Sequence, residues 1–119
     1  MKTYFVSGHL DLTQEEFELH YKRELDKALK EGASFVIGDA RGTDSMSQLY
    51  LLGMTEKVTV YHMFKKPRNN AGFNMKGDFT SDKERDRAMT SASTHDIAWV
   101  RPGRENSGTA KNLARRLLS

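Results

Sequence analysis

Short apolar runs alternate with amphipathic segments along almost the whole chain, and this alternation limits the folds open to it. Four runs rich in β-branched and aromatic residues are typical of buried strands: 3–7, 33–37, 57–64 and 95–100. Helices are expected between and after these strands, at 13–30, 45–52, 81–93 and 110–118. Strands that alternate with helices favour a parallel sheet, because a parallel crossover usually passes through a helix.

The expected elements make an α/β fold, a Rossmann-like three-layer sandwich with a mostly parallel sheet of four or five strands. Thr13 and Glu16 form the capping-box pattern that opens the first helix, and Gly32 is placed to end it in the left-handed conformation. The stretch 65–80 is polar and rich in glycine and asparagine, so we expect a loop there. At 119 residues, the chain is expected to form a single domain over 1–119.

Composition narrows the classes of protein further. The chain has no cysteine, which removes disulfides and thiolate chemistry, and no apolar run long enough to cross a membrane. The apolar stretch at the start of the sequence is too short, and polar residues follow too early, for a secretory signal. A cytoplasmic location is therefore expected. Lys and Arg number 19 against 16 Asp and Glu, a formal charge of +3. Dedicated nucleic-acid binders usually carry a stronger basic stripe, so nucleic acid is the less favoured partner and an anionic small molecule the favoured one.

The segment 38–44, Gly-Asp-Ala-Arg-Gly-Thr-Asp, joins a predicted strand directly to a predicted helix. Its glycines allow a tight turn and close approach of a ligand, and the first N–H groups of the helix suit an anion. Arg41 could donate to a phosphate, while Asp39 and Asp44 could bind sugar hydroxyls or take part in acid–base chemistry. The alternative is a tight turn whose helix is capped by Thr43 or Asp44.

Other turns of this kind are expected at the same edge of the sheet. The first predicted strand ends in Ser-Gly-His at 7–9, and the last predicted helix follows Ser-Gly-Thr at 107–109. Ligands of open α/β sheets bind outside the carboxyl ends of the strands, where these turns would gather. The sequence therefore predicts a nucleotide site at this edge.

These segments resemble the Rossmann-like SLOG superfamily, which includes DNA-processing protein A, cytokinin-activating phosphoribohydrolases and small stand-alone nucleotide-binding proteins. The resemblance rests on 6–9, 38–44, 84–89 and 107–109, which occur in the family's order. It implies that the first and last turns hold a phosphate and that the middle turn contacts ribose or phosphate. The ligand-binding residues expected on this basis are Ser7, Gly8, His9, Gly38, Ala40, Arg41, Gly42, Thr43, Arg85, Ser107, Gly108 and Thr109.

The chain departs from the cytokinin-activating enzymes in the last of these turns. Their turn Pro-Gly-Gly-x-Gly-Thr-x-x-Glu ends in an acid that helps catalysis, whereas this chain has Asn112 there. The nucleoside deoxyribosyltransferases, which have a related-looking fold, use a carboxylate as nucleophile at the anomeric carbon. The candidates for a catalytic carboxylate in this chain are Asp39, Asp44 and Asp86, with Glu105 as a further acid.

Several residues have two interpretations each. His9 could bind phosphate or move a proton near neutral pH, or it could be an exposed loop histidine. Arg85 and Asp86 could meet a phosphate and a ribose hydroxyl, or they could form a surface ion pair. Phe73 and Phe79 could stack on a base, or they could anchor the predicted loop to the core or to a partner subunit.

We therefore predict a protein that binds a nucleotide or a nucleoside-phosphate derivative. Cleavage of the N-glycosidic bond by a hydrolase is one hypothesis, and a non-catalytic nucleotide sensor or sequestering protein is the alternative. Nucleic-acid binding through the basic last helix is a weaker alternative. No dedicated metal site is expected, since His20, His62 and His95 lack ligand spacing, although Mg²⁺ could accompany a nucleotide. A homo-oligomer is expected because small sheets of this type often complete their sites against a copy of themselves.

Overall fold

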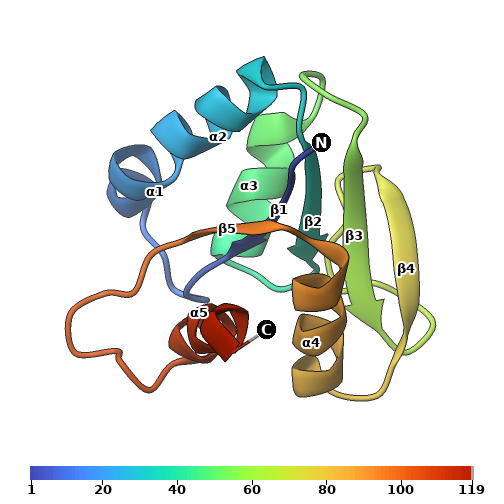
Figure 1. Cartoon of the computed structure of the whole chain (residues 1–119). Helices are drawn as coiled ribbons and strands as arrows, with labels where there is room; N and C mark the ends of the chain where they lie inside the picture. Colours follow the sequence, from blue (N-terminus) through green and yellow to red (C-terminus); the bar gives the residue numbers. More distant parts are fainter. Residues whose placement is uncertain (119) are drawn as a thin grey trace.

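The computed structural model describes residues 1–118 and contains one five-stranded sheet in which all neighbouring strands are parallel (Figure 1). The strands are β1 (Thr3–Ser7), β2 (Ser34–Gly38), β3 (Val58–Met63), β4 (Asn74–Phe79) and β5 (His95–Ala98), in the spatial order β4-β3-β2-β1-β5. The helices are α1 (Gln14–His20), α2 (Lys22–Lys30), α3 (Thr43–Leu51), α4 (Asp82–Ala92) and α5 (Gly108–Leu118). The expected Rossmann-like α/β fold is thus confirmed.

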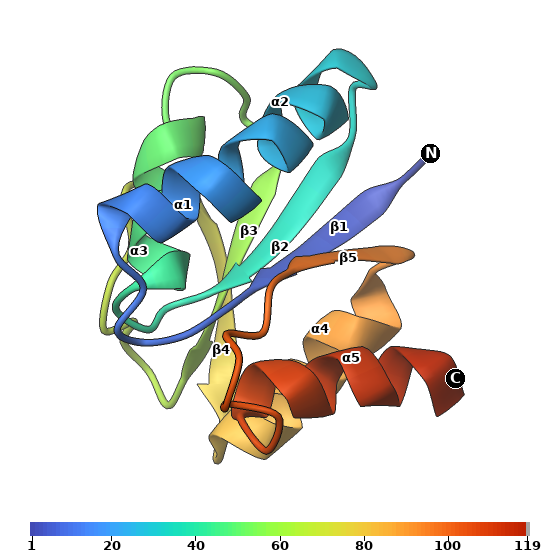
Figure 2. The ribbon, with the colours of Figure 1, turned by 90° about the vertical axis from the view of Figure 1, so that its left-hand side faces the viewer.

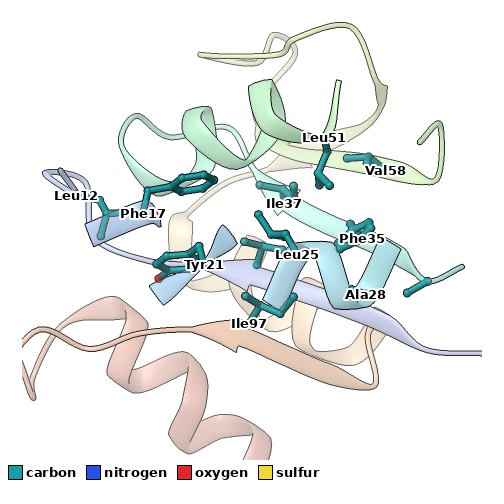
Figure 3. Close-up of a cluster of buried hydrophobic side chains, with 12 residues drawn as sticks. Leu12, Phe17, Tyr21, Leu25, Ala28, Phe35, Ile37, Leu51, Val58 and Ile97 are labelled. Atoms are coloured by element: carbon teal, nitrogen blue, oxygen red, sulfur yellow. The ribbon is translucent and has the colours of Figure 1, made fainter. Parts of the chain in front are cut away.

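Helices cover both faces of the sheet. Figures 1 and 2 show α1, α2 and α3 on one face and α4 and α5 on the other. The larger core cluster lies under the first group, and Figure 3 shows its members, among them Phe17, Tyr21, Leu25, Ile37 and Ile97. A smaller cluster under α4 consists of Phe5, Val36, Tyr61 and Met89. Burial of these apolar side chains on both faces of the strands holds the three layers together.

The main departure from the sequence expectation is β4, which lies within the stretch expected to be a loop. β4 is an edge strand, and four of its six residues are exposed, so it carries no apolar pattern that would have revealed it. The connection 64–73 reaches it from β3 without a helix. Gln48 of α3 fixes this connection: its fully buried amide donates to the Gly38 carbonyl (2.9 Å) and accepts from the Ala71 N–H (2.9 Å).

The helix expected over 13–30 is divided at Tyr21, whose backbone (φ −117°) separates α1 from α2. The hydroxyl of Tyr21 donates to the Ser7 carbonyl (2.7 Å) and accepts from the Trp99 N–H (3.0 Å). Ser7 and Ala98 form the last pair in the register of β1 and β5. The hydroxyl therefore bridges backbone groups of the two strands at the point where they separate.

The separation of β1 and β5 defines the place where a ligand would bind. These strands are neighbours, but α1 follows β1 on one face of the sheet and α5 follows β5 on the other (Figure 2). Such a topological switch point leaves a crevice between the two outgoing loops.

We expect Tyr21→Phe to lower the free energy of unfolding by roughly 1–3 kcal/mol, because it leaves the buried Ser7 carbonyl and Trp99 N–H without their partner. Urea denaturation measures this loss. Tyr4→Phe is the matched control, since the Tyr4 hydroxyl bonds the Glu31 carboxylate in an exposed setting. Equal losses in the two variants would contradict the role given to Tyr21.

Candidate functional site

A cavity of about 530 Å³ opens at the carboxyl edge of the sheet, on the side of α4 and α5. Its walls come from the turns after β1, β2 and β5 and from the first turns of α4 and α5. Most of the site residues expected from sequence line it: Ser7, Gly8, His9, Ala40, Asp44, Arg85, Asp86, Ser107, Gly108 and Thr109. The fold therefore gathers into one cavity segments that lie a hundred residues apart in the chain.

Ser7 places an unpaired hydroxyl at this cavity. Successive residues of a strand point to opposite faces, so Ser7 shares the α4 side of the sheet with Phe5, while Val6 packs in the opposite core. Ser7 is 6% exposed, and its Oγ has no hydrogen-bond partner among residues 1–118. Because a buried hydroxyl without a partner is costly, this atom is suited to a ligand.

The N-terminus of α5 faces the same cavity. Ser107 caps the helix, since its Oγ accepts from the Ala110 N–H (3.2 Å), which makes its hydroxyl part of the helix end. No hydrogen bond of the described residues engages the N–H groups of Gly108 and Thr109. A Cβ on Gly108 would meet nothing within 4 Å, so the space beside it is open. Free N–H groups at the positive end of a helix dipole form a seat for an anion.

Asp39 lies behind the cavity wall and holds two arginines that line it. Its Oδ2 accepts from the backbone N–H of Arg68 (2.7 Å), and its Oδ1 accepts from Arg68 Nη2 (2.9 Å) and Arg85 Nη1 (2.8 Å). Burial alone would raise the pKa of Asp39, but the bonds from Arg68 and the charge of Arg85 outweigh it and lower the pKa. Asp39 is therefore an ionised anchor for both cations.

Arg68 is a site residue that sequence reasoning missed. It lies in the connection 64–73, and nothing in a polar loop distinguishes one arginine that reaches the sheet edge from its exposed basic neighbours. Arg85 was expected at the site, and it is buried rather than part of a surface pair. Its guanidinium contacts Asp86 (3.1 Å) and Asp82 (3.3 Å) as well as Asp39.

Asp44 is a buried carboxyl group at the cavity. It accepts from the Ala40 N–H (3.1 Å), and burial raises its pKa to about 7 despite the nearby charge of Arg85. Gly38 makes this arrangement possible, because a Cβ there would lie 2.5 Å from Asp44 Oδ2 and 3.3 Å from Arg85 Cζ. Gly38 thus permits the close packing of an acid and a cation and does not itself line the cavity.

The remaining residues of the turn after β2 include two that contact the turn after β1. Thr43 Oγ1 donates to the His9 carbonyl (3.0 Å), and Gly42 adopts φ +71° against the same carbonyl. A Cβ on Gly8 would clash with the Thr43 hydroxyl and the Tyr21 hydroxyl. Arg41 is exposed, and neither it nor Gly42 nor Thr43 lines the cavity. Gly8, Gly42 and Thr43 therefore hold the turns after β1 and β2 close together.

His9 is buried, so the alternative of an exposed loop histidine is wrong. Its Nε2 accepts from the Arg101 N–H (2.8 Å), and its ring meets Trp99 edge-on. Burial, followed by the charges of Arg101 and Arg104, lowers the pKa of His9. The neutral ring therefore fastens the loop after β5 to the turn after β1, and so fixes two walls of the cavity.

Two further expectations concern aromatic residues and metals. Phe73 packs against the larger core cluster, and Phe79 stacks on Tyr61 with ring centroids 5.8 Å apart, so both anchor β4 and its connection to the core. Residues 1–118 contain no group of three or more His, Cys, Asp or Glu side chains placed to hold a metal ion. Within the same residues, no helix combines the length and apolar character that crossing a membrane requires.

Comparison with known proteins supports the fold. No protein-family profile matches the chain, and no curated protein matches it. Among solved structures, it is similar to DNA processing protein A from Helicobacter pylori, a structure reported for its unique mode of binding single-stranded DNA. The TM-score is 0.69 at 19% sequence identity, and the match covers 97% of this chain and 60% of that one. The likeness establishes a shared fold, while membership of the SLOG superfamily stays a prediction.

The raised pKa of Asp44 predicts a pH dependence of stability. The carboxyl is neutral in the folded protein up to about pH 7 but ionises near its ordinary value of 3.8 when the chain unfolds. Its contribution to stability is therefore full below the ordinary value and is lost as the pH rises through 7. Between pH 5 and 8 we expect the free energy of unfolding of wild type to fall by on the order of a few kcal/mol relative to that of Asp44→Asn. Denaturant unfolding measures both values.

Asp78→Asn is the control for this measurement, because Asp78 is exposed and asparagine tolerates its left-handed backbone. If Asp44→Asn and wild type followed the same pH profile, Asp44 would not be a neutral buried acid.

Proposed function

We propose that the cavity binds a nucleoside phosphate, with the phosphate between Ser7 and the N-terminus of α5. The observation that carries this proposal is the coincidence of two unsatisfied donor sets at one place. The buried Ser7 hydroxyl has no partner among the described residues, and the N–H groups of Gly108 and Thr109 are free. A phosphate oxygen accepts from hydroxyl and backbone N–H donors of this kind.

The rest of the cavity suits a nucleoside. Its volume of about 530 Å³ lies within the range of small-molecule sites, roughly 300–1,000 Å³. Asp82 and Asp86 supply carboxylate oxygens that could accept from ribose hydroxyls, and Leu10, which is 51% exposed, supplies apolar surface for a base. A cavity lined by both polar and apolar side chains favours a ligand that has both kinds of group.

Cleavage of the N-glycosidic bond is the finer form of this proposal. Asp44 and Asp86 line the cavity, whereas Asp39 is engaged behind it. With its pKa near 7, Asp44 can hold a proton for a leaving base at neutral pH, and Asp86 offers a carboxylate to the anomeric carbon. Enzymes that break glycosidic bonds usually use two carboxyl groups in different environments, one as an acid and one as a nucleophile or base.

Replacement of two buried serines tests the phosphate seat. We expect Ser7→Ala to weaken binding by roughly 3–10-fold, the loss of one hydrogen bond, for the tightest binder among nucleoside monophosphates, cyclic nucleotides and ADP-ribose. Isothermal titration calorimetry measures the affinity. Ser47→Ala is the matched control, since Ser47 is also buried with an unpaired Oγ but lies away from the cavity.

The same mixtures, analysed by chromatography, separate cleavage from binding. Release of free base that disappears in Asp44→Asn and Asp86→Asn supports a hydrolase, and recovery of intact ligand supports a non-catalytic sensor. Equal effects of Ser7→Ala and Ser47→Ala, or no binding of any compound in the panel, would contradict the proposal.

A second function, binding of single-stranded nucleic acid, is favoured by an exposed aromatic residue and by the DNA-binding neighbour. Phe64 is 61% exposed, and its left-handed backbone (φ +55°) is held by hydrogen bonds to Phe79 and Asp78. The exposed Lys65 and Lys66 follow it directly. An aromatic residue beside basic residues is a common platform for a single strand.

For this second function, we expect Phe64→Ala to weaken binding of oligo(dT) and the double variant Lys65→Ala/Lys66→Ala to reduce the salt dependence. The slope of log affinity against log salt should become shallower by roughly 1.4, because about 0.7 ions are released per contact. Fluorescence anisotropy at several salt concentrations measures it. Lys27→Ala/Lys30→Ala on α2 is the control, and an unchanged slope in both double variants would exclude this surface.

A further inference from the structure

The arginines of the cavity are already paired with carboxylates of the protein. Arg85 contacts Asp39 (2.8 Å), Asp86 (3.1 Å) and Asp82 (3.3 Å). Arg68 shares two of these partners, Asp39 (2.9 Å) and Asp82 (3.2 Å). The third arginine of the lining, Arg104, lies 3.6 Å from a carboxylate oxygen of Asp11, outside the cavity.

The charges around the cavity therefore leave no excess of cations. Arg101 shares Asp11 with Arg104 (3.1 Å) and pairs with Glu16 (2.7 Å), so four arginines face five carboxylates, those of Asp11, Glu16, Asp39, Asp82 and Asp86. His9 contributes no positive charge while its Nε2 accepts a hydrogen bond. Apart from the arginines, the positive potential in the cavity comes from the N-termini of α4 and α5, each equivalent to about half a charge, and the acids Asp82 and Glu84 in the first turn of α4 offset its share.

We infer that the phosphate bound in this cavity is a diester with a single negative charge, as in a cyclic or otherwise esterified nucleoside phosphate. This inference rests on the proposed function and names the ligand class for the same site. The Ser7 hydroxyl and the N–H groups of Gly108 and Thr109 supply neutral donors and one helix dipole, which match a monoanion.

A phosphate monoester or a polyphosphate fits these charges less well. A monoester carries close to two charges at neutral pH, because its second pKa is about 6. To balance the added charge, Arg85 or Arg68 would have to leave Asp39, which is buried and would then lose one of its two cationic partners. The ionised Asp82 and Asp86 also line the cavity and repel a second charge.

The test compares nucleotides whose phosphate groups carry different charges. Calorimetry at pH 8 measures the affinity of adenosine 5′-monophosphate, its methyl ester, 3′,5′-cyclic adenosine monophosphate and ATP, with the guanosine, cytidine and uridine series beside them. We expect the best methyl ester or cyclic nucleotide to bind at least 10-fold more tightly than its monoester, and ATP to bind still more weakly. At pH 5.5 most of the monoester has taken up a proton and the carboxyl of Asp44 is neutral, so the difference between ester and monoester should shrink.

Two variants link the preference to the carboxylates. Asp82→Asn removes one charge at an exposed position of the cavity and should reduce the preference for the ester several-fold. Asp78→Asn, exposed and outside the lining, should leave the preference unchanged. A phosphodiester can also come from a nucleic acid, so a dinucleotide and (dT)12 are included. Affinity that keeps rising with the number of linkages would overturn the assignment to a small molecule.

The outcomes separate this inference from the function on which it rests. A monoester that binds as tightly as its ester at pH 8, in any base series, would overturn the inference and leave nucleotide binding standing. An ester preference that survives unchanged in Asp82→Asn would remove its electrostatic basis. If none of the compounds bound in any series, the proposed function would fail, and the inference would fail with it.

Discussion

The hydroxyl of Tyr21 is the contact on which the shape of the site depends. It is fully buried, and burial raises its pKa to about 12, so it keeps its proton and donates to the Ser7 carbonyl while accepting from the Trp99 N–H. Without this bridge, β1 and β5 would have unsatisfied backbone groups where they part. Beyond it, one loop leaves toward α1 and the other toward α5 (Figure 2), and both loops line the cavity.

Asp39 sets the electrostatics of the site in a similar way, from a position that no ligand needs to touch. It fixes the half-exposed Arg68 and the buried Arg85 in the lining of the cavity, and it cancels part of their charge. The result is a cavity with several guanidinium groups and little excess positive charge. A count of basic residues in the sequence would have suggested a stronger attraction for anions than the paired arginines can supply.

Much of the fold could be predicted from the sequence because its signals are local. The capping box of Thr13 and Glu16 and the left-handed Gly32 are both present as expected. β4 could not be predicted, because an edge strand with exposed residues has no apolar pattern and depends on its pairing with β3. The division of the first helix at Tyr21 is likewise set by contacts with distant strands, and no signal near Tyr21 in the sequence indicates it.

The sequence predicted which segments meet at the site better than it predicted what each residue does there. Turns that follow parallel strands must meet at one edge, so Ser7, Asp44 and Thr109 were placed together correctly. The role expected of Asp39 depended on which way a buried side chain points, and Arg68 lay in an unpatterned loop. The roles of Asp39 and Arg68 both depend on contacts between residues about 30 positions apart in the chain. Homo-oligomeric assembly stays a prediction.

We propose above all that a phosphate binds in the crevice between the end of β1 and the N-terminus of α5. An amide NMR titration with 3′,5′-cyclic adenosine monophosphate and its guanosine, cytidine and uridine counterparts tests it most directly. We predict that the resonances of Gly108, Thr109 and Gly8 shift first and saturate together. Shifts confined to the far end of the molecule, around Met54 and Gly72, or to the loop after Phe64, would contradict it.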